Sequence, residues 1–239
     1  MEIFGKRPWI QAAIDKFTLE EAIPCAQMAV DCGVDWVEVG TPLIYGEGLE
    51  SIRELKKIAG DKASIMVDFK IRTNVYDIFL KAKEAGCDVA TISCAGGNDP
   101  AIIEGLRARQ DCGIKIIADL CGSELQDLPK RTEDLCGLGV DAVILHYGDD
   151  QWFYNYVREM ADGVRECKKV AGLDVPIGCC CGYAPPGKGT GLDAHGNVIE
   201  AIKQGVDWVV VGGALTGEHD KNAYERFGFL CEFVHSCRK

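Results

Sequence analysis

A short motif recurs four times along the chain and joins a glycine, any residue and an aspartate to a run of apolar residues. Glycine ends a helix readily because it adopts the left-handed backbone conformation without a steric penalty, and a continuous apolar run is typical of a strand buried on both faces. Each copy therefore predicts the end of a helix followed by a short buried strand. The copies begin at Gly33, Gly86, Gly139 and Gly205.

Four more short apolar runs lie between these copies and predict further strands, and the segments between the runs have apolar positions at helical spacing. Thr18, followed by Leu19, Glu20 and Glu21, forms a capping-box pattern that predicts the start of one helix. The further strands are predicted at Ile10–Asp15, Ser64–Phe69, Lys115–Leu120 and Val175–Cys180. Helices are predicted at Leu19–Cys32, Leu49–Ile58, Val75–Ala85 and Asp193–Gln204.

Strand and helix alternate eight times in this prediction, which indicates parallel strands joined by helical crossovers. An open, doubly wound sheet is the alternative arrangement. Eight repeats in 239 residues match the usual size of a closed α/β barrel, so we expect a single-domain (β/α)8 TIM barrel over residues 1–239. In such barrels the catalytic groups lie at the carboxyl ends of the strands, whereas the amino ends contribute to stability.

The composition and charge of the chain indicate which kinds of partner it has. Hydrophobic residues make up 47% of the chain and charged residues 26%, yet no apolar segment is long enough to span a bilayer. Residues 1–9 lack the apolar core of a signal peptide, so we expect a cytoplasmic protein with no membrane partner. The net charge of −11 argues against a nucleic-acid partner, because phosphate backbones attract basic surfaces, but it leaves a small phosphorylated substrate open.

Thirteen cysteines are many for a chain of this length. Without an export signal, and with enough residues for a large core, we expect reduced thiols rather than disulfides. Cys179, Cys180 and Cys181 are consecutive, and their side chains alternate in direction along a strand. We therefore interpret this triplet as small buried residues rather than as a shared metal site.

Ionisable residues stand at the ends of the predicted strands in unusual number. Carboxylates that converge on the mouth of an apolar barrel repel one another unless a cation lies among them. Lys70 supplies part of that positive charge, and Mg²⁺ held by carboxylates, waters and substrate oxygens would supply the rest. Such an ion stabilises an enolate or enediolate formed beside a carbonyl group. The strand-end residues are Asp15, Glu38, Thr41, Asp68, Lys70, Asp119, His146, Gly212 and Gly213.

Several of these residues have a structural alternative. Asp15 could cap the helix that follows it, and Asp68 and Lys70 could form only an ion pair. Asp119 could be a structural acid that contacts the catalytic residues but not the substrate. His146 could be a core histidine with satisfied hydrogen bonds. A buried glutamate without a function is unusual, which favours a functional role for Glu38.

Seven segments form a combination that is specific, although each segment alone is weak: Gln11–Asp15, Val37–Ile44, Glu47–Leu49, Asp68–Lys70, Ala118–Leu120, His146 and Val209–Thr216. This combination resembles the orotidine-monophosphate-decarboxylase suprafamily, in particular its branch of 3-hexulose-6-phosphate synthases and 3-keto-L-gulonate-6-phosphate decarboxylases. The resemblance extends from about Trp9 to Gly228, which is nearly the whole chain.

The resemblance implies a homodimer with active sites near the interface and a metal-stabilised enediolate of a pentulose phosphate. It implies Mg²⁺ bound through Glu38 and Asp68, a catalytic Lys70, and His146 as a proton-transfer or positioning group. The synthases add formaldehyde to the enediolate, whereas the decarboxylases generate it by losing CO2. The decarboxylases usually have an arginine where Gly213 stands, so this position favours the synthase.

The chain departs from the family at two places. The family pattern after Asp68 and Lys70 continues to a second aspartate that reaches across the dimer interface, but this chain has Thr73, which carries no charge at neutral pH. After the seventh strand, a longer loop over residues 179–190 replaces a short phosphate-binding turn. Lys188 in that loop and Gly191 after it are candidates for phosphate binding, together with Gly212, Gly213 and Thr41, although a surface loop is the alternative.

We therefore expect a carbon–carbon lyase that acts on a sugar phosphate, most like 3-hexulose-6-phosphate synthase, with Asp15, Lys70, Asp119 and His146 as catalytic residues. The first alternative is the decarboxylase. Thr73 leaves open a pentulose-phosphate epimerase or isomerase that uses the same enediolate. The last alternative is a barrel that binds a sugar phosphate without turnover.

Overall fold

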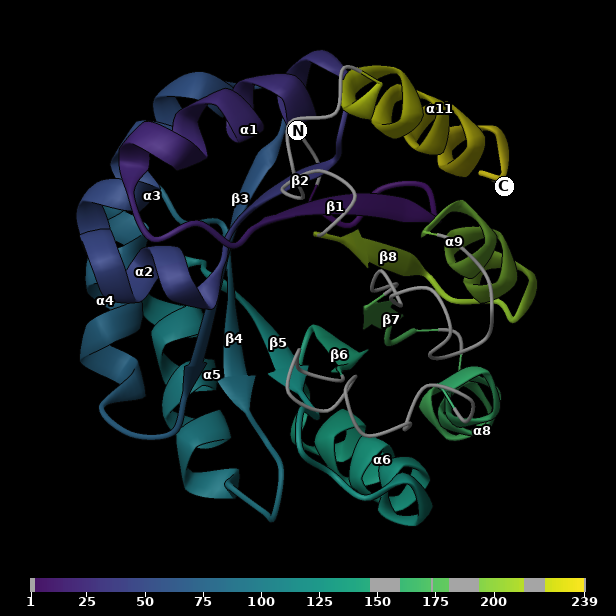
Figure 1. Ribbon diagram of the computed structural model, residues 1–239. Coiled ribbons are helices and arrows are strands. Elements are labelled where there is room, and N and C mark those ends of the chain that lie inside the picture. Colours follow the sequence, from purple (N-terminus) through teal and green to yellow (C-terminus); the bar gives the residue numbers. More distant parts are fainter. Residues whose placement is uncertain (1–2, 147–159, 173, 181–193, 213–221, 239) are drawn as a thin grey trace.

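The computed structural model describes residues 3–146, 160–172, 174–180, 194–212 and 222–238. Eight parallel strands pair in chain order, and the last pairs with the first, so the sheet closes into a barrel (Figure 1). This confirms the (β/α)8 TIM barrel and shows that the open-sheet alternative is wrong. The strands are β1 Trp9–Ile14, β2 Trp36–Val39, β3 Ser64–Ile71, β4 Val89–Ser93, β5 Lys115–Asp119, β6 Ala142–Leu145, β7 Ile177–Cys180 and β8 Trp208–Val211.

Helices surround the barrel on its outer side (Figure 1). They are α1 Leu19–Asp31, α2 Thr41–Glu47, α3 Leu49–Ala59, α4 Val75–Ala85, α5 Asp99–Cys112, α6 Leu128–Leu138, α8 Met160–Ala171, α9 Ala194–Lys203 and α11 Ala223–Ser236, with a short 3₁₀ helix at Leu125–Asp127. Among the described residues, no helix combines the length and the apolar character that crossing a membrane requires.

The predicted helix boundaries agree closely with the structure. Helix α4 has the predicted bounds, and α1 ends one residue earlier than predicted. Thr18 is the N-cap of α1, and its hydroxyl oxygen accepts a hydrogen bond of 3.4 Å from the backbone N–H of Glu21. The sequence did not predict α2, a seven-residue helix that Pro42 starts because its ring fixes a helical φ angle near the N-terminus.

The recurring aspartates have an architectural role at the amino ends of the strands. Each carboxylate accepts a hydrogen bond from a backbone N–H near the start of the preceding strand, and each also pairs with a basic side chain. Asp207, for example, accepts from the N–H of Ile177 at 2.7 Å and from the ammonium group of Lys168 at 2.6 Å. The other aspartates accept at 2.9 Å in the pairs Asp35 with Ile10, Asp88 with Ile65, and Asp141 with Ile116.

Apolar packing closes the amino end of the barrel. The rings of Trp9 and Trp36 stack with centroids 5.3 Å apart, and Trp208 lies 5.6 Å from Trp36. Gly178 leaves room for this cluster, since a Cβ atom there would lie 2.0 Å from the Trp208 ring. The amino end is therefore filled, and polar chemistry is concentrated at the other end of the strands.

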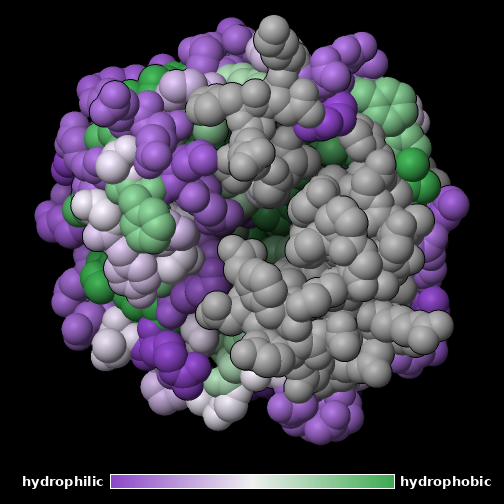
Figure 2. Space-filling view, in the orientation of Figure 1, coloured by the Kyte–Doolittle hydropathy of each residue, from purple (hydrophilic) through white to green (hydrophobic). Residues whose placement is uncertain are grey.

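Hydrophilic side chains cover most of the outer rim of the molecule, and the surface is hollowed near its centre (Figure 2).

Candidate active site at the carboxyl ends of the strands

Lys70 is held in an unusual backbone conformation at the end of β3. Its φ angle is 46°, in the left-handed region that side chains rarely adopt, and the pairing of β3 with β4 shifts register between Val67 and Ile71. Such a conformation costs about 1 kcal/mol or more and persists where the surroundings enforce it. Here the backbone N–H of Lys70 donates to the hydroxyl of Thr91 at 3.1 Å, which fixes the irregular strand end.

The Lys70 side chain turns back onto its own strand. Its ammonium group forms an ion pair with Asp68 and donates a hydrogen bond of 2.9 Å to the hydroxyl of Thr41. Although burial opposes the charge, Asp68, Asp119 and Glu38 raise the pKa of Lys70 above its ordinary value. Lys70 is therefore a firmly protonated cation among carboxylates.

Asp68 is buried, and both of its carboxylate oxygens have hydrogen-bond partners. One carboxylate oxygen accepts from the Thr91 hydroxyl at 2.9 Å, and the other lies 2.9 Å from the Thr41 hydroxyl and pairs with Lys70. Burial opposes ionisation, but Lys70 and His146 hold the pKa of Asp68 below its ordinary value. In this arrangement the Thr41 hydroxyl contacts Asp68 and Lys70 directly.

Glu38 lies on β2, beside β3, and is buried at 4% exposure. One carboxylate oxygen accepts a hydrogen bond of 2.6 Å from the side-chain amide of Gln11. Burial, together with Asp68 and Asp15, raises the pKa of Glu38 to about 8, and Gln11 and Lys70 offset this only in part. The side-chain carbonyl oxygen of Gln11 is also buried, and none of the described residues donates to it.

These observations fit a hard divalent cation. Three carboxylates interact here with the ammonium group of Lys70, and their negative charge adds to burial in raising the pKa of Glu38. The donors are oxygens, including the buried carbonyl oxygen of Gln11, and Mg²⁺ prefers oxygen ligands. Glu38 and Asp68 are the residues that would hold such an ion.

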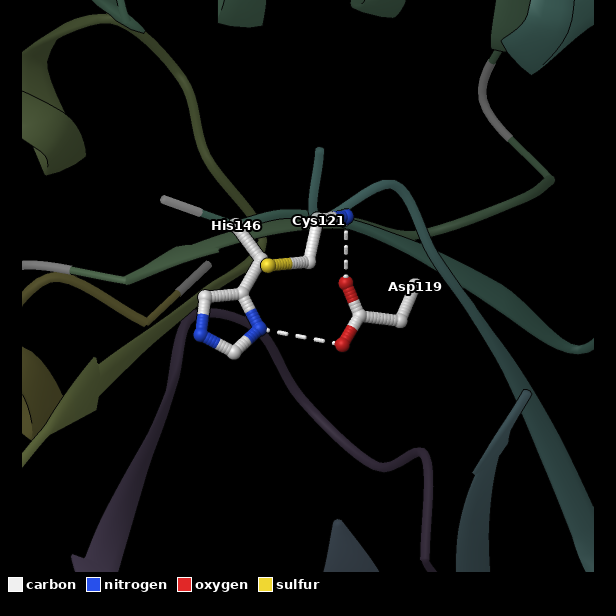
Figure 3. Close-up of side chains that lie close together, drawn as sticks. All are labelled: Asp119, Cys121 and His146. Atoms are coloured by element: carbon white, nitrogen blue, oxygen red, sulfur yellow. Dashed lines mark hydrogen bonds and ion pairs between the residues drawn. The ribbon is translucent and has the colours of Figure 1, made fainter. Parts of the chain in front are cut away.

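A second pair of residues stands at the ends of β5 and β6. Asp119 is completely buried, and one of its carboxylate oxygens lies 3.0 Å from Nδ1 of His146 (Figure 3). The other oxygen accepts a hydrogen bond of 2.7 Å from the backbone N–H of Cys121. Burial alone would lower the pKa of His146, but Cys180 and Asp119 raise it well above its ordinary value. His146 is thus an imidazole that a buried acid orients through Nδ1 and whose charged form its neighbours favour.

Asp15 lies between the ends of β2 and β8. A Cβ atom at Gly40 would lie 2.2 Å from one of its carboxylate oxygens, and a Cβ atom at Gly212 would lie 3.2 Å from the other. Only glycine at position 40 allows this close approach. The suggestion that Asp15 caps the following helix is wrong, because Thr18 is the cap residue. Asp15 is instead an exposed carboxylate at the mouth of the barrel.

The structure brings most of the predicted site residues together at one end of the barrel: Asp15, Glu38, Thr41, Asp68, Lys70, Asp119, His146 and Gly212. The predicted phosphate-binding residues Lys188, Gly191 and Gly213 lie outside the described residues. Thr73 is exposed in the segment between β3 and α4. Cys179 packs between barrel and helices whereas Cys180 packs toward the barrel interior, as the predicted alternation requires.

Sequence reasoning assigned no role to Gln11, Thr91 or Cys121, although all three contact the site. Gln11 and Thr91 lie inside strands, and an inward-pointing polar residue in an apolar run was the signal available for both. Cys121 follows Asp119 by two residues, and this short spacing from a strand-end acid was the signal available for it.

Comparisons with known proteins agree with this fold. A 3-hexulose-6-phosphate synthase from Bacillus subtilis (strain 168) is 30% identical over 214 residues, which are 89% of this chain and 92% of the relative. The crystal structure of a 3-hexulose-6-phosphate synthase from Salmonella typhimurium has a TM-score of 0.78 at 24% identity and covers 95% of this chain and 100% of its own. A 3-keto-L-gulonate-6-phosphate decarboxylase from Vibrio cholerae O1 biovar El Tor str. N16961 shares the fold, with a TM-score of 0.72, 19% identity, and coverage of 95% and 99%.

The family model matches residues 8–227, which include the whole barrel and every strand-end residue described above. The chain therefore belongs to the orotidine 5′-phosphate decarboxylase / HUMPS family.

Proposed function

We propose that this protein is a carbon–carbon lyase that acts on a sugar phosphate, most like 3-hexulose-6-phosphate synthase, which joins formaldehyde to ribulose 5-phosphate. The observation that carries the proposal is the convergence of Glu38 and Asp68 on a protonated Lys70. This grouping suits chemistry in which negative charge develops on the oxygens of a substrate. The curated relatives named as 3-hexulose-6-phosphate synthases support the choice of reaction.

Lys70 has the charge and position to stabilise an enediolate. It is fixed by its ion pair with Asp68 and by the Thr41 hydroxyl, so little reorganisation is needed when a substrate oxygen becomes negative. Because its pKa is raised, Lys70 acts as a hydrogen-bond donor and not as a base.

His146 and Asp15 are the proposed proton-handling groups. Asp119 fixes the imidazole through Nδ1 and favours its protonated form, so His146 can donate a proton to a substrate oxygen. Asp15 is an exposed carboxylate of the cluster and can accept a proton from substrate carbon. These roles assign the acid and the base to two different residues, which follow different strands of the barrel.

Glu38 and Asp68 would hold Mg²⁺ through their carboxylate oxygens. When bound, Mg²⁺ supplies positive charge that stabilises the enediolate oxygens of the substrate. Gln11 keeps Glu38 oriented toward this position. The proposed contacts of the substrate phosphate are Gly191, Gly212, Gly213 and Lys188, because its negative charge suits backbone N–H groups and a lysine.

A homodimer is part of the proposal. Phe17 and Tyr45 are 68% and 76% exposed, and their segments touch, because a Cβ atom at Gly46 would lie 2.2 Å from the carbonyl oxygen of Phe17. Two large exposed rings beside the mouth of the barrel support a subunit interface there. A cytoplasmic location is supported by the cysteines, since every described one is a thiol. The net charge of −11 supports a partner other than nucleic acid.

The test is turnover of ribulose 5-phosphate with formaldehyde, with and without Mg²⁺, followed by NMR of the sugar product. Formation of a hexulose 6-phosphate that depends on both substrates and on Mg²⁺ is expected. Loss of CO2 from 3-keto-L-gulonate 6-phosphate, without the aldol reaction, would instead identify a decarboxylase. Exchange of solvent deuterium into the pentulose phosphate, without carbon–carbon bond change, would identify an epimerase or isomerase. Binding without any turnover would contradict an enzyme.

A further inference from the structure

Three side chains that could each bind a metal ion through a different element lie at the ends of β5 and β6. A carboxylate oxygen of Asp119, the sulfur of Cys121 and an imidazole nitrogen of His146 all lie within 4.8 Å of one another (Figure 3). These donors are oxygen, sulfur and nitrogen, whereas Glu38 and Asp68 offer oxygen alone. Thiolate and imidazole favour zinc and related transition metals over Mg²⁺.

The backbone positions all three donors. Asp119 is the last residue of β5, and the N–H of Cys121 bonds back to its carboxylate at 2.7 Å, so the thiol is held beside the acid. Gly122 follows with a φ angle of 84°, which completes the tight turn. His146 comes directly after β6, and β5 and β6 pair with each other. The cluster therefore depends on short side chains at neighbouring strand ends and not on long mobile ones.

The cluster also has the right size for a metal ion. Zinc binds nitrogen and oxygen at about 2.0–2.2 Å and sulfur at about 2.3 Å, so the ligands of a tetrahedral site lie roughly 3–4 Å apart. The nitrogen of His146 and the oxygen of Asp119 are already 3.0 Å apart, and the whole set lies within 4.8 Å. Small side-chain rotations would suffice, and three protein ligands would leave one position open.

The surroundings of His146 support coordination through its Nδ1 atom. The Cys180 thiol, at the end of β7, hydrogen-bonds the same imidazole. A second partner of this kind fixes the orientation of a ligating histidine ring. Coordination through Nδ1 would replace the present hydrogen bond to Asp119.

We propose that Asp119, Cys121 and His146 form a second cation site, selective for a thiophilic divalent ion such as Zn²⁺, and that an ion bound there inhibits the enzyme. The Cys121 thiol and the Nδ1 atom of His146 each give up a proton to the solvent when the ion binds. Inhibition follows because the ion occupies two of the proposed catalytic groups. That second part rests on the proposed function, whereas the binding site itself does not.

The binding test uses Co²⁺ as a spectroscopic probe on the full chain after treatment with a chelator. We expect one equivalent of Co²⁺ to produce a thiolate-to-cobalt charge-transfer band in the near ultraviolet, and Zn²⁺ to abolish it by displacement. Cys121→Ser should lose the band, and Cys237→Ser, a matched change at another partly exposed thiol, should keep it. Cys121→Asp should still bind Co²⁺ but without the band, which separates loss of sulfur from loss of folding.

Three results would overturn the site: no band in the natural chain, a full band in Cys121→Ser, or loss of the band in Glu38→Gln. Glu38 is not one of the three ligands of the second site, so this variant should keep the band.

Turnover tests the inhibition separately. Zn²⁺ at one equivalent should reduce lyase turnover at least tenfold in the natural chain and much less in Cys121→Ser, and excess Mg²⁺ should not restore it. A cobalt band without any lyase activity would refute the proposed function and leave the site standing. Lyase activity that Zn²⁺ leaves unchanged, despite the cobalt band, would refute inhibition alone.

Discussion

The side-chain amide of Gln11 donates a hydrogen bond of 2.6 Å to the carboxylate of Glu38, and both residues are buried inside the barrel. This contact links β1 to β2 between the apolar interior of the barrel and the polar residues at the carboxyl ends of the strands. It supplies a neutral hydrogen bond that lowers the pKa of Glu38 and so offsets part of the effect of burial. Gln11 is therefore a positioning residue for the proposed metal ligand.

Replacing Gln11 by leucine should weaken Mg²⁺ binding by about 10-fold to 100-fold, because groups that orient a metal ligand typically contribute this much. Isothermal titration calorimetry on the purified variant would measure the change. Gln27→Leu, on the exposed surface of α1, is the control and should bind Mg²⁺ as the natural chain does. Equal Mg²⁺ affinity in both variants would contradict the role of Gln11.

The raised pKa of Glu38 predicts a stability that depends on pH. A carboxyl group whose pKa increases from 4.5 to about 8 on folding binds its proton more tightly in the folded state. Its contribution is fully present below pH 4.5 and is lost as the pH rises through 8. In the absence of divalent ions, the free energy of unfolding should fall by up to about 1.4 kcal/mol per pH unit across this range.

Thermal unfolding in a chelator, from about pH 5 to pH 9, would measure this dependence. Glu38→Gln cannot titrate, so its midpoint should change less with pH than that of the natural chain. Saturating Mg²⁺ should stabilise the natural chain most at the alkaline end, where Glu38 is ionised. Parallel curves for the two proteins would show that Glu38 does not titrate in this range.

Lys70→Ala should reduce lyase turnover by roughly 100-fold to 1,000-fold, the usual effect of removing one preorganised donor to a developing oxyanion. Steady-state kinetics with ribulose 5-phosphate and formaldehyde would measure it. Lys81→Ala, which removes an exposed lysine on α4, should leave turnover unchanged. A loss smaller than tenfold for Lys70→Ala would exclude Lys70 from the chemical step.

Asp207→Ala should destabilise the fold by about 2–4 kcal/mol, because it leaves the buried N–H of Ile177 and the ammonium group of Lys168 without their acceptor. The melting temperature should fall by roughly 5–15 °C for a chain of this size. Differential scanning calorimetry would compare this variant with Asp31→Ala, a change at an exposed aspartate of α1. A similar small effect in both would argue against the architectural role.

Tyr45→Lys combined with Phe17→Lys should convert the proposed homodimer to monomers, because two charges would have to be buried in an apolar contact. Sedimentation velocity would report the mass of the species in solution. Tyr224→Lys, at a 50% exposed aromatic residue on α11, should leave the dimer intact. A natural chain that sediments as a monomer would contradict the interface.

The sequence was sufficient to predict the barrel because its strands are continuous apolar runs and several of its helices end at a glycine. Helix α4 could be bounded correctly for the same reason. Helix α2 was missed because seven residues make about two turns, too few for a periodic pattern. The residues at the strand ends were also predictable, since closure of the barrel brings them to one mouth.

The contacts within the site were less predictable. That Thr91 supports both Asp68 and the backbone of Lys70 depends on the register shift of β3 against β4, which no local pattern encodes. The pairing of Gln11 with Glu38 depends in the same way on the alignment of β1 with β2. The left-handed conformation of Lys70 is likewise a product of tertiary structure.

The four recurring aspartates divide the barrel into quarters. Each one fastens an odd-numbered strand to the even-numbered strand that follows it, so the molecule has a pseudo-fourfold symmetry at its amino end. The opposite end breaks this symmetry: one quarter provides Asp15 and Glu38, the next Asp68 and Lys70, and the third Asp119 and His146. Repetition is confined to the scaffold, and these three quarters contribute different functional groups to a shared centre.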